Sequence, residues 1–219
     1  FYTDVTYYAG VKEIYKRYKP THVIHLAAQT SITDSFLDPF GSIKINVDGS
    51  LNVIYCIQES SLPIPLIFAS SAGVYDDSKW GYPQQYESSI TNPKTPYGVS
   101  KLAVEGYCKC MLKSPLTIFR YSNVYGPNAT NGIVKIAIDR IKNGLPVNMH
   151  MMNNVPGDKG CIRDYIYIDD VVSANLMALD GKLQGTFNVS SNIGSYTQWL
   201  LEKIASLMGV GPNIKTNVP

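Results

Sequence analysis

A tyrosine and a lysine four positions apart, Tyr97 and Lys101, are the pair in this sequence that could move a proton. On a helix these positions share one face, so the ammonium can lie near the phenol and favour its ionised form. The pKa of tyrosine is ordinarily about 10, and a base acting near neutrality needs roughly 3 units less, or about 4 kcal/mol. Such a shift requires a partly buried site with a second cation. The pair therefore predicts removal of a proton from a hydroxyl group.

The spacing alone is not specific, because several tyrosines precede a lysine by four positions, namely Tyr8, Tyr15, Tyr75 and Tyr97. Only Tyr97 follows a Ser-Ser strand end, Ser70-Ser71, across a loop and then opens a helix. Ser71 could hydrogen-bond the same substrate oxygen that Tyr97 deprotonates. The alternative for Tyr97 and Lys101 is a solvated helix start without a chemical role.

Short apolar runs alternate with helical patterns through the first half of the chain. The patterns predict helices at 11–18, 35–60 and 97–113, and strands at 22–26, 66–69 and 116–121. Strands of near-continuous apolar content, separated by helices, are typical of a parallel sheet covered on both faces. Ligands of such α/β folds bind outside the C-terminal ends of the strands, where Ser70 and Ser71 lie.

After residue 125 the pattern changes to a turn, short strands and helices at 132–142, 169–179 and 196–208. It predicts two domains, a first at 1–125 and a smaller, irregular α/β lobe at 126–219 that is interleaved with the first. Three methionines are expected to pack in that lobe, namely Met149, Met151 and Met152.

Composition excludes several classes of protein. The 219 residues, 45% of them hydrophobic, can bury a core. A net charge of +2 with 16% charged residues gives no global field for nucleic acid or an anionic membrane. The apolar runs are too short to span a membrane. Four cysteines without Cys-x-x-Cys spacing predict reduced thiols and a cytoplasmic protein, and His22 and His25 are expected to be core or edge residues rather than metal ligands.

Six segments occur in the order and spacing of a known family. They read HLAA at 25–28, NVDGSLN at 46–52, SSAGVY at 70–75, PYGVSK at 96–101, RYSNVYGP at 120–127 and RDYIYIDDV at 163–171. Over nearly its whole length the chain resembles the NAD-dependent epimerase/dehydratase family, the extended short-chain dehydrogenases that act on nucleotide sugars.

The resemblance implies a Rossmann-like doubly wound parallel sheet, NAD as cofactor and no metal. It also implies that residues 1–125 form a dinucleotide-binding domain and residues 126–219 a substrate lobe. The residues that it places at the cofactor are Asp4, Val5, Leu26, Ala27, Ala28, Thr30, Asn46, Ser70, Tyr97, Lys101 and Tyr121. It implies catalytic roles for Ser71, Tyr97 and Lys101, and contacts to substrate from Ser71, Tyr97, Asn123 and Arg163. The alternatives are tight packing for the alanines, a buried bridging amide for Asn46, and a surface ion pair with Asp164 for Arg163.

The implied chemistry begins with oxidation at the sugar C4. Dehydratases of the family carry Asp and Glu directly after the catalytic threonine, whereas this chain has Ala72 and Gly73, which cannot move a proton. The expected reaction is 4-epimerisation of a nucleotide sugar, with UDP-glucose and UDP-galactose as the leading pair. The alternatives are 4,6-dehydration or another oxidoreduction of the family, and a catalytically silent nucleotide-binding homologue. The helices predicted at 35–60 and 97–113 would pair two copies in a four-helix contact.

Two features depart from the family pattern. The Gly-x-x-Gly-x-x-Gly loop that holds the pyrophosphate does not occur in these residues, so the first βαβ unit is expected to be missing, in a fragment or a natural truncation that binds dinucleotide poorly. Its absence would leave one edge of the sheet open and removes the residue that separates NAD from NADP. Asp76 stands where a glycine usually follows Val-Tyr.

Overall fold

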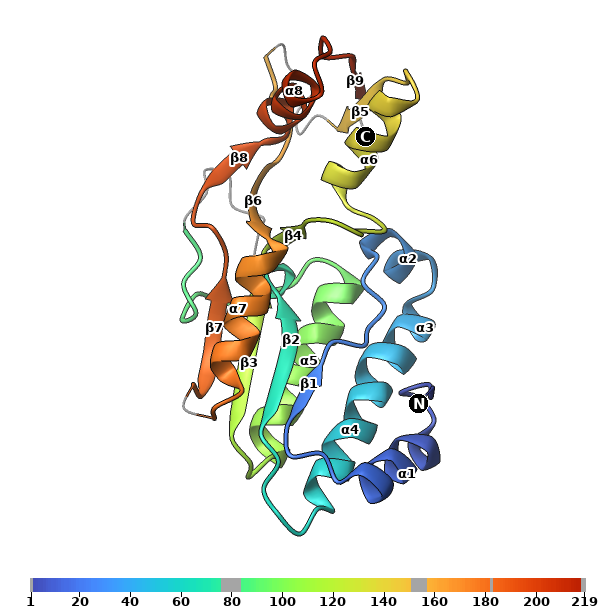
Figure 1. Ribbon diagram of the computed structural model, residues 1–219, viewed down its shortest axis with the longest axis vertical. Helices are drawn as coiled ribbons and strands as arrows, with labels where there is room; N and C mark the ends of the chain where they lie inside the picture. Colours follow the sequence, from blue (N-terminus) through green and yellow to red (C-terminus); the bar gives the residue numbers. More distant parts are fainter. Residues whose placement is uncertain (1, 76–83, 151–156, 182, 218–219) are drawn as a thin grey trace. The chain divides into compact units, whose positions relative to one another are not determined.

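The computed structural model describes residues 2–75, 84–150, 157–181 and 183–217 (Figure 1). They form two compact units, Phe1–Tyr121 with Val172–Val189, and Ser122–Val171 with Ser190–Pro219. Asp76, Met151 and Met152 lie outside the described residues. The predicted division by function, into residues 1–125 and 126–219, stays a prediction.

The first unit is built on a parallel sheet of four strands in the order β1-β2-β3-β7. The strands are β1 (Val23–His25), β2 (Leu66–Ser71), β3 (Leu116–Tyr121) and β7 (Gly185–Val189). Ser71 pairs with Tyr121, and Tyr121 with Val189, so the C-terminal ends of three strands meet at one edge. The α/β fold with a parallel sheet is therefore confirmed. Among the described strands β1 pairs with β2 alone.

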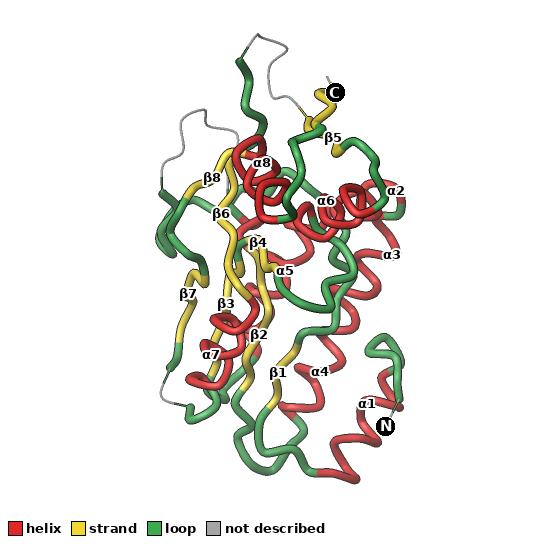
Figure 2. The backbone as a smooth tube through the Cα atoms, turned by 45° about the horizontal axis from the view of Figure 1, so that its top comes forward, coloured by secondary structure: helices red, strands yellow, loops and turns green. Residues whose placement is uncertain are grey.

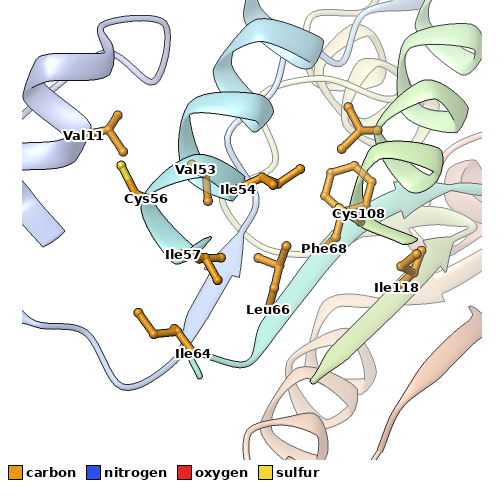
Figure 3. Close-up of a cluster of buried hydrophobic side chains, with 11 residues drawn as sticks. Val11, Val53, Ile54, Cys56, Ile57, Ile64, Leu66, Phe68, Cys108 and Ile118 are labelled. Atoms are coloured by element: carbon orange, nitrogen blue, oxygen red, sulfur yellow. The ribbon is translucent and has the colours of Figure 1, made fainter. Parts of the chain in front are cut away.

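Helices lie on both sides of this sheet. On one side are α1 (Tyr8–Tyr18), α4 (Gly49–Gln58) and α5 (Pro96–Met111), whereas α7 (Ile168–Ala178) lies in front of β3 in both views (Figures 1 and 2). Successive side chains of β2 alternate between the two faces, so Leu66 and Phe68 point toward α4 and α5. They join a buried cluster from α1, α4, β2, α5 and β3 whose side chains point toward one another, including Val11, Val53, Ile54, Ile57, Leu66, Phe68, Cys108 and Ile118 (Figure 3). This cluster is the core that holds α5 on the sheet.

The continuous helix predicted at 35–60 is wrong. The segment contains α2 (Ile32–Leu37), α3 (Pro39–Ile43), a π-helical turn, η1 (Lys44–Asp48), and then α4. The chain breaks at Asp38, whose carboxylate accepts a hydrogen bond from the Gly41 amide at 2.9 Å, and Pro39 opens the next helix. Asp is a good helix cap, and Pro has no amide hydrogen to continue the previous helix, so the break has a local cause.

The second unit contains two small sheets. In one, β6 (Ile162–Tyr167) lies parallel to β4 (Asn123–Tyr125) and antiparallel to β8 (Gly194–Tyr196); in the other, β5 (Val147–His150) is parallel to β9 (Ile214–Asn217). The helices α6 (Ile133–Lys142) and α8 (Thr197–Leu207) contribute to a cluster with Met149, whose predicted packing is confirmed. None of the helices in the described part of the chain has the length and apolarity needed to cross a membrane.

Candidate active site

Helix α5 begins at the C-terminal edge of the sheet and brings Tyr97 to Ser71, the last residue of β2. Thr95 caps the helix by accepting a hydrogen bond from the Gly98 amide at 3.0 Å, and the Ser35 hydroxyl accepts one from the Tyr97 amide at 3.2 Å. The half-buried phenol of Tyr97 hydrogen-bonds the side chain of Ser71. Ser71 also accepts a hydrogen bond from the Gly73 amide at 3.1 Å. These contacts fix the phenol beside the serine hydroxyl.

Lys101 lies one helical turn after Tyr97 and is buried, with 4% of its surface exposed. Its Nζ donates a hydrogen bond to the Ala69 carbonyl at 2.7 Å. The same nitrogen lies 5.1 Å from the centre of the Phe68 ring and 5.9 Å from the centre of the Tyr97 ring. Ser71, Tyr97 and Lys101, which the sequence assigned to one site, are thus brought together.

The protonation of this pair differs from the expectation. Burial raises the pKa of Tyr97, and the hydrogen bond with Ser71 offsets only part of that rise. Burial also lowers the pKa of Lys101, to about 8. The phenol therefore shifts in the direction opposite to the one that the Tyr-Lys spacing predicts, because desolvation outweighs an ammonium that is directed at Ala69. In the protein alone, Tyr97 carries its proton at neutral pH.

Asn46, in the π-helical turn, ties the segment after β1 to helix α5. Its Oδ1 accepts a hydrogen bond from the Gln29 amide at 2.7 Å, and its Nδ2 donates to the Gln29 carbonyl at 3.1 Å and to the Ser100 hydroxyl at 2.9 Å. Both amide hydrogens are used within the protein, which favours the bridging alternative, while the predicted contact with a cofactor stays a prediction. Gln29 was missed by sequence reasoning, because its role depends on backbone geometry.

Ser70 points into the protein rather than toward the edge of the sheet. It is buried, and its hydroxyl donates to Glu105 Oε1 at 2.6 Å. Glu105 in turn binds the guanidinium of Arg120 on β3. Neither charged residue was singled out from the sequence, although an arginine inside the apolar strand at 116–121 was a visible signal. The predicted cofactor contact of Ser70 stays a prediction.

The other residues predicted at the cofactor lie around the segment that follows β1 and near α4. Leu26, Ala27 and Thr30 are exposed and Ala28 is half-buried. Asp4 is exposed, and its carboxylate accepts hydrogen bonds at 2.8 Å from both the amide and the hydroxyl of Thr6. The side chain of Val5 lies beside Gly49 of α4. On β3, the hydroxyl of Tyr121 accepts a hydrogen bond from Asn175 at 2.8 Å.

Two predicted substrate contacts, Asn123 and Arg163, belong to the second unit. Asn123 donates to the Asp164 carbonyl at 2.9 Å. The exposed guanidinium of Arg163 donates to the Ile162 carbonyl at 3.0 Å. The carboxylate of Asp164 accepts hydrogen bonds from its own set of donors, namely the Ser122 hydroxyl, the Ser191 amide and hydroxyl, and the Ile193 amide.

Helix α5 approaches the turn after β2 so closely that position 98 has no room for a side chain. A Cβ atom on Gly98 would lie 2.3 Å from the Gly73 carbonyl oxygen and 2.9 Å from Pro93 Cβ. We expect Gly98→Ala to push α5 away from Ser71 and to lower the free energy of unfolding by about 1–3 kcal/mol. Gly106→Ala on the same helix is the matched control, since nothing lies within 4 Å of its added methyl group.

Alanine at position 106 is expected to stabilise the protein by about 0.5–1 kcal/mol, because glycine is a poor helix former. Urea unfolding of both variants measures the difference. Equal changes in the two variants would contradict the close approach of α5 to Gly73.

Comparison with known proteins places this geometry in a family. A model of the NAD dependent epimerase/dehydratase family matches residues 1–194. A Methanocaldococcus jannaschii protein provisionally named UDP-glucose 4-epimerase is 36% identical over 182 residues, which are 79% of this chain and 55% of that protein. The GDP-6-deoxy-D-mannose reductase of Pseudomonas aeruginosa is 31% identical over 202 residues, 87% of this chain and 64% of that protein. The chain thus spans between half and two thirds of the length of these relatives.

Solved structures show the same fold. The crystal structure of Thermus thermophilus UDP-glucose 4-epimerase in complex with NAD matches with a TM-score of 0.90 and 33% identity, covering 99% of this chain and 71% of that chain. Since the family model spans most of the sequence and the fold agrees over nearly all of it, the chain belongs to the NAD-dependent epimerase/dehydratase family.

Proposed function

We propose that this chain carries the catalytic residues of an NAD-dependent nucleotide-sugar 4-epimerase, with UDP-glucose and UDP-galactose as the leading substrate pair. The observation that carries the proposal is the meeting of Ser71, Tyr97 and Lys101 at the strand ends. Relatives named UDP-glucose 4-epimerase in Mycoplasma genitalium and Thermus thermophilus support it.

The residues present fit a dinucleotide cofactor. After β1, Ala27 is exposed and Ala28 is half-buried, and their small side chains allow a ligand to approach the backbone. The Lys101 ammonium is suited to ribose hydroxyl groups. A bound nicotinamide dinucleotide supplies the hydride acceptor for C4 and, in the second half of the reaction, the hydride donor.

In the proposed mechanism the ionised form of Tyr97 takes the proton of the C4 hydroxyl while the C4 hydride leaves. Ser71 donates a hydrogen bond to the oxygen as it becomes a carbonyl. The nearby Lys101 cation stabilises the tyrosinate, which needs this help because burial raises the pKa of Tyr97. Tyr97 returns the proton when the opposite face of the keto sugar is reduced.

The residue at position 73 bears on whether the reaction is epimerisation or elimination of water. A Cβ atom on Gly73 would lie 3.4 Å from Ser71 Oγ and 4.0 Å from Tyr97 Cε1, so a side chain there would face the catalytic pair. Elimination of water needs an acid and a base in addition to Tyr97. Glycine at 73 and alanine at 72 supply neither, which favours epimerisation over dehydration.

A keto-sugar reductase is the second candidate. Tyr97 holds its proton at neutral pH, which suits a proton donor. The reductase from Pseudomonas aeruginosa is among the relatives. Proton NMR of the products from UDP-galactose and NAD tests the epimerase against a dehydratase. UDP-glucose supports the epimerase, and a 4-keto-6-deoxy sugar overturns it in favour of a dehydratase.

If no product forms, the substrate assignment is wrong, and calorimetric titration with NAD separates the remaining possibilities. Saturable NAD binding then leaves another nucleotide sugar or a keto-sugar reductase to be tested. No binding, even with a glycine-rich βαβ unit added at the N-terminus, indicates a silent homologue.

We also infer that the protein works in the cytosol, where its four free thiols would stay reduced.

We further infer that two copies pair through α5 and the segment before α4. A groove of about 500 Å³ lies along these helices, with an apolar lining that includes Ile43, Val47, Val99, Ala103 and Tyr107. Val99 is 54% exposed in the single chain. Apolar groups gathered on one face in this way are typical of a subunit contact.

Val99→Asp is expected to convert the homodimer into a monomer, because it places a charge in the apolar contact. Val172→Asp is the matched control, since Val172 is 47% exposed on α7, outside the groove. Light scattering after gel filtration gives the molar mass. A wild-type monomer, or a dimer that survives Val99→Asp, would contradict this contact.

A further inference from the structure

A buried carboxylate lies one helical turn beyond Lys101. Glu105 has 1% of its surface exposed, and three hydrogen bonds hold its carboxylate. The donors are the Ser70 hydroxyl at 2.6 Å, Arg120 Nε at 2.9 Å and Arg120 Nη2 at 2.7 Å. The guanidinium thus grips both carboxylate oxygens, the geometry in which an arginine binds a carboxylate most strongly.

Arg120 is itself fixed at its other end. It is 4% exposed, and its Nη1 donates to the Tyr75 hydroxyl at 2.8 Å and to the Glu87 carbonyl at 3.2 Å. The Tyr75 hydroxyl donates in turn to Asn188 on β7 at 2.6 Å. The guanidinium is therefore held on the sheet from both sides, and the carboxylate of Glu105 is held with it.

A second lysine lies one helical turn from this carboxylate on α5. Lys101 and Glu105 are four residues apart on α5, the spacing at which opposite charges pair on a helix. Lys109, four residues on the other side, does approach Glu105, at 3.5 Å. Lys101 instead donates to the Ala69 carbonyl, with its nitrogen near the Tyr97 ring.

We propose that Arg120 is a positioning residue, which holds the Glu105 carboxylate on β3 so that this carboxylate does not pair with the Lys101 ammonium. Lys101 is thereby left directed at Ala69 and Tyr97. The inference rests on the proposed function in one respect, that Lys101 assists Tyr97.

Few of the described residues place a titratable or charged group toward these two side chains. Glu105 faces Ser70 of β2, Arg120 of β3, and Lys109 and Cys108 of its own helix. Lys101 faces Tyr97 and, from β1, His25. Burial lowers the pKa of His25 to about 4, so that ring is neutral at pH 7. Removing Arg120 would thus leave the Glu105 carboxylate with the ion pair to Lys109 at 3.5 Å and with Lys101 one turn away on the other side.

The pKa of Lys101 tests this directly. It is measured in the full chain, without substrate or cofactor, by following the 13C shift of the lysine Cε with pH, and Lys101→Arg assigns the signal. We expect Arg120→Met to raise the pKa of Lys101 by about 1 unit or more, because it frees a carboxylate nearby. Glu105→Gln is expected to lower it, because Arg120 then stands as an unpaired cation. The double variant is expected to return it close to the wild-type value.

If Arg120→Met does not fold, Arg120→Lys takes its place, because lysine keeps the charge but has fewer hydrogen-bond donors. We expect Arg120→Lys to raise the pKa of Lys101 less than Arg120→Met does. If the ion pair were merely structural, every single variant would be less stable, but the pKa of Lys101 would not rise in the Arg120 variants and fall in Glu105→Gln. Unchanged Lys101 titration in both the arginine and the glutamate variants, or a double variant that does not restore it, overturns the proposal.

The proposed function can fail separately. If the wild-type protein turns over no nucleotide sugar, the Lys101 titration still reports on Arg120. If Tyr97 is required for turnover but the pKa of Lys101 does not move, only the role of Arg120 is wrong.

Discussion

Replacing Tyr97 with phenylalanine is expected to lower kcat for nucleotide-sugar turnover by about 10³-fold, which is typical for loss of a positioned acid or base. The ring and its packing stay, since only the hydroxyl that bonds Ser71 is removed. Binding of the nucleotide sugar should weaken by about tenfold at most, the effect of losing one hydrogen bond. The variant should therefore lose mainly the rate of proton transfer rather than the affinity for the nucleotide sugar.

Tyr55→Phe is the matched control, because that tyrosine is 48% exposed on α4 and plays no part in the proposed chemistry. It should turn over like the wild type. A Tyr97→Phe protein that keeps more than a tenth of the wild-type kcat would show that another group moves the proton.

Acidification is expected to destabilise the protein through His25. This ring is 5% exposed and makes a hydrogen bond with Ser50 at 2.9 Å. Burial lowers its pKa in the folded state from 6.5 to about 4. Between these values the unfolded chain binds a proton that the folded protein does not, so stability falls as the pH falls from 6.5 to about 4. The full difference amounts to about 3 kcal/mol, and above pH 6.5 His25 contributes no pH dependence.

Urea unfolding at pH 7 and pH 5 measures this contribution. The wild type should lose about 2 kcal/mol through His25 between these two pH values, in addition to what the carboxylates contribute. His25→Gln should lack that loss, whereas His22→Gln, at an exposed ring, should lose as much as the wild type. Equal losses in the wild type and His25→Gln would contradict a buried, neutral His25.

The strands were predictable because a buried parallel strand is apolar along most of its length. The run at 116–121 has the bounds of β3 for this reason. The break at Asp38 and Pro39 carried a local signal, but the helical spacing of apolar residues continues across it. The π-helical turn at Asn46 left no trace in the spacing; there Asn46 makes hydrogen bonds to Gln29 and to Ser100 of α5, which exist only in the folded chain.

The proposed catalytic cluster was predictable in part. Ser71 and Tyr97 were identified because a Ser-Ser strand end and a following helix start meet at the same edge of a parallel sheet. The direction of the pKa shift of Tyr97 was not predictable, because the spacing of residues gives no information about desolvation. The pairing of Glu105 with Arg120 depends on how α5 is registered against β3, which only the folded structure gives.

The central claim is that Tyr97 transfers the proton in an NAD-dependent epimerisation at C4. Its most direct test is the rate of conversion of UDP-galactose into UDP-glucose with added NAD, with and without Tyr97→Phe. The rate is measured for the 219-residue chain and for the same chain preceded by a glycine-rich βαβ unit. The account predicts turnover in the extended protein that Tyr97→Phe abolishes or nearly so. Turnover that persists without the Tyr97 hydroxyl, or none in the extended protein although it binds NAD, would contradict it.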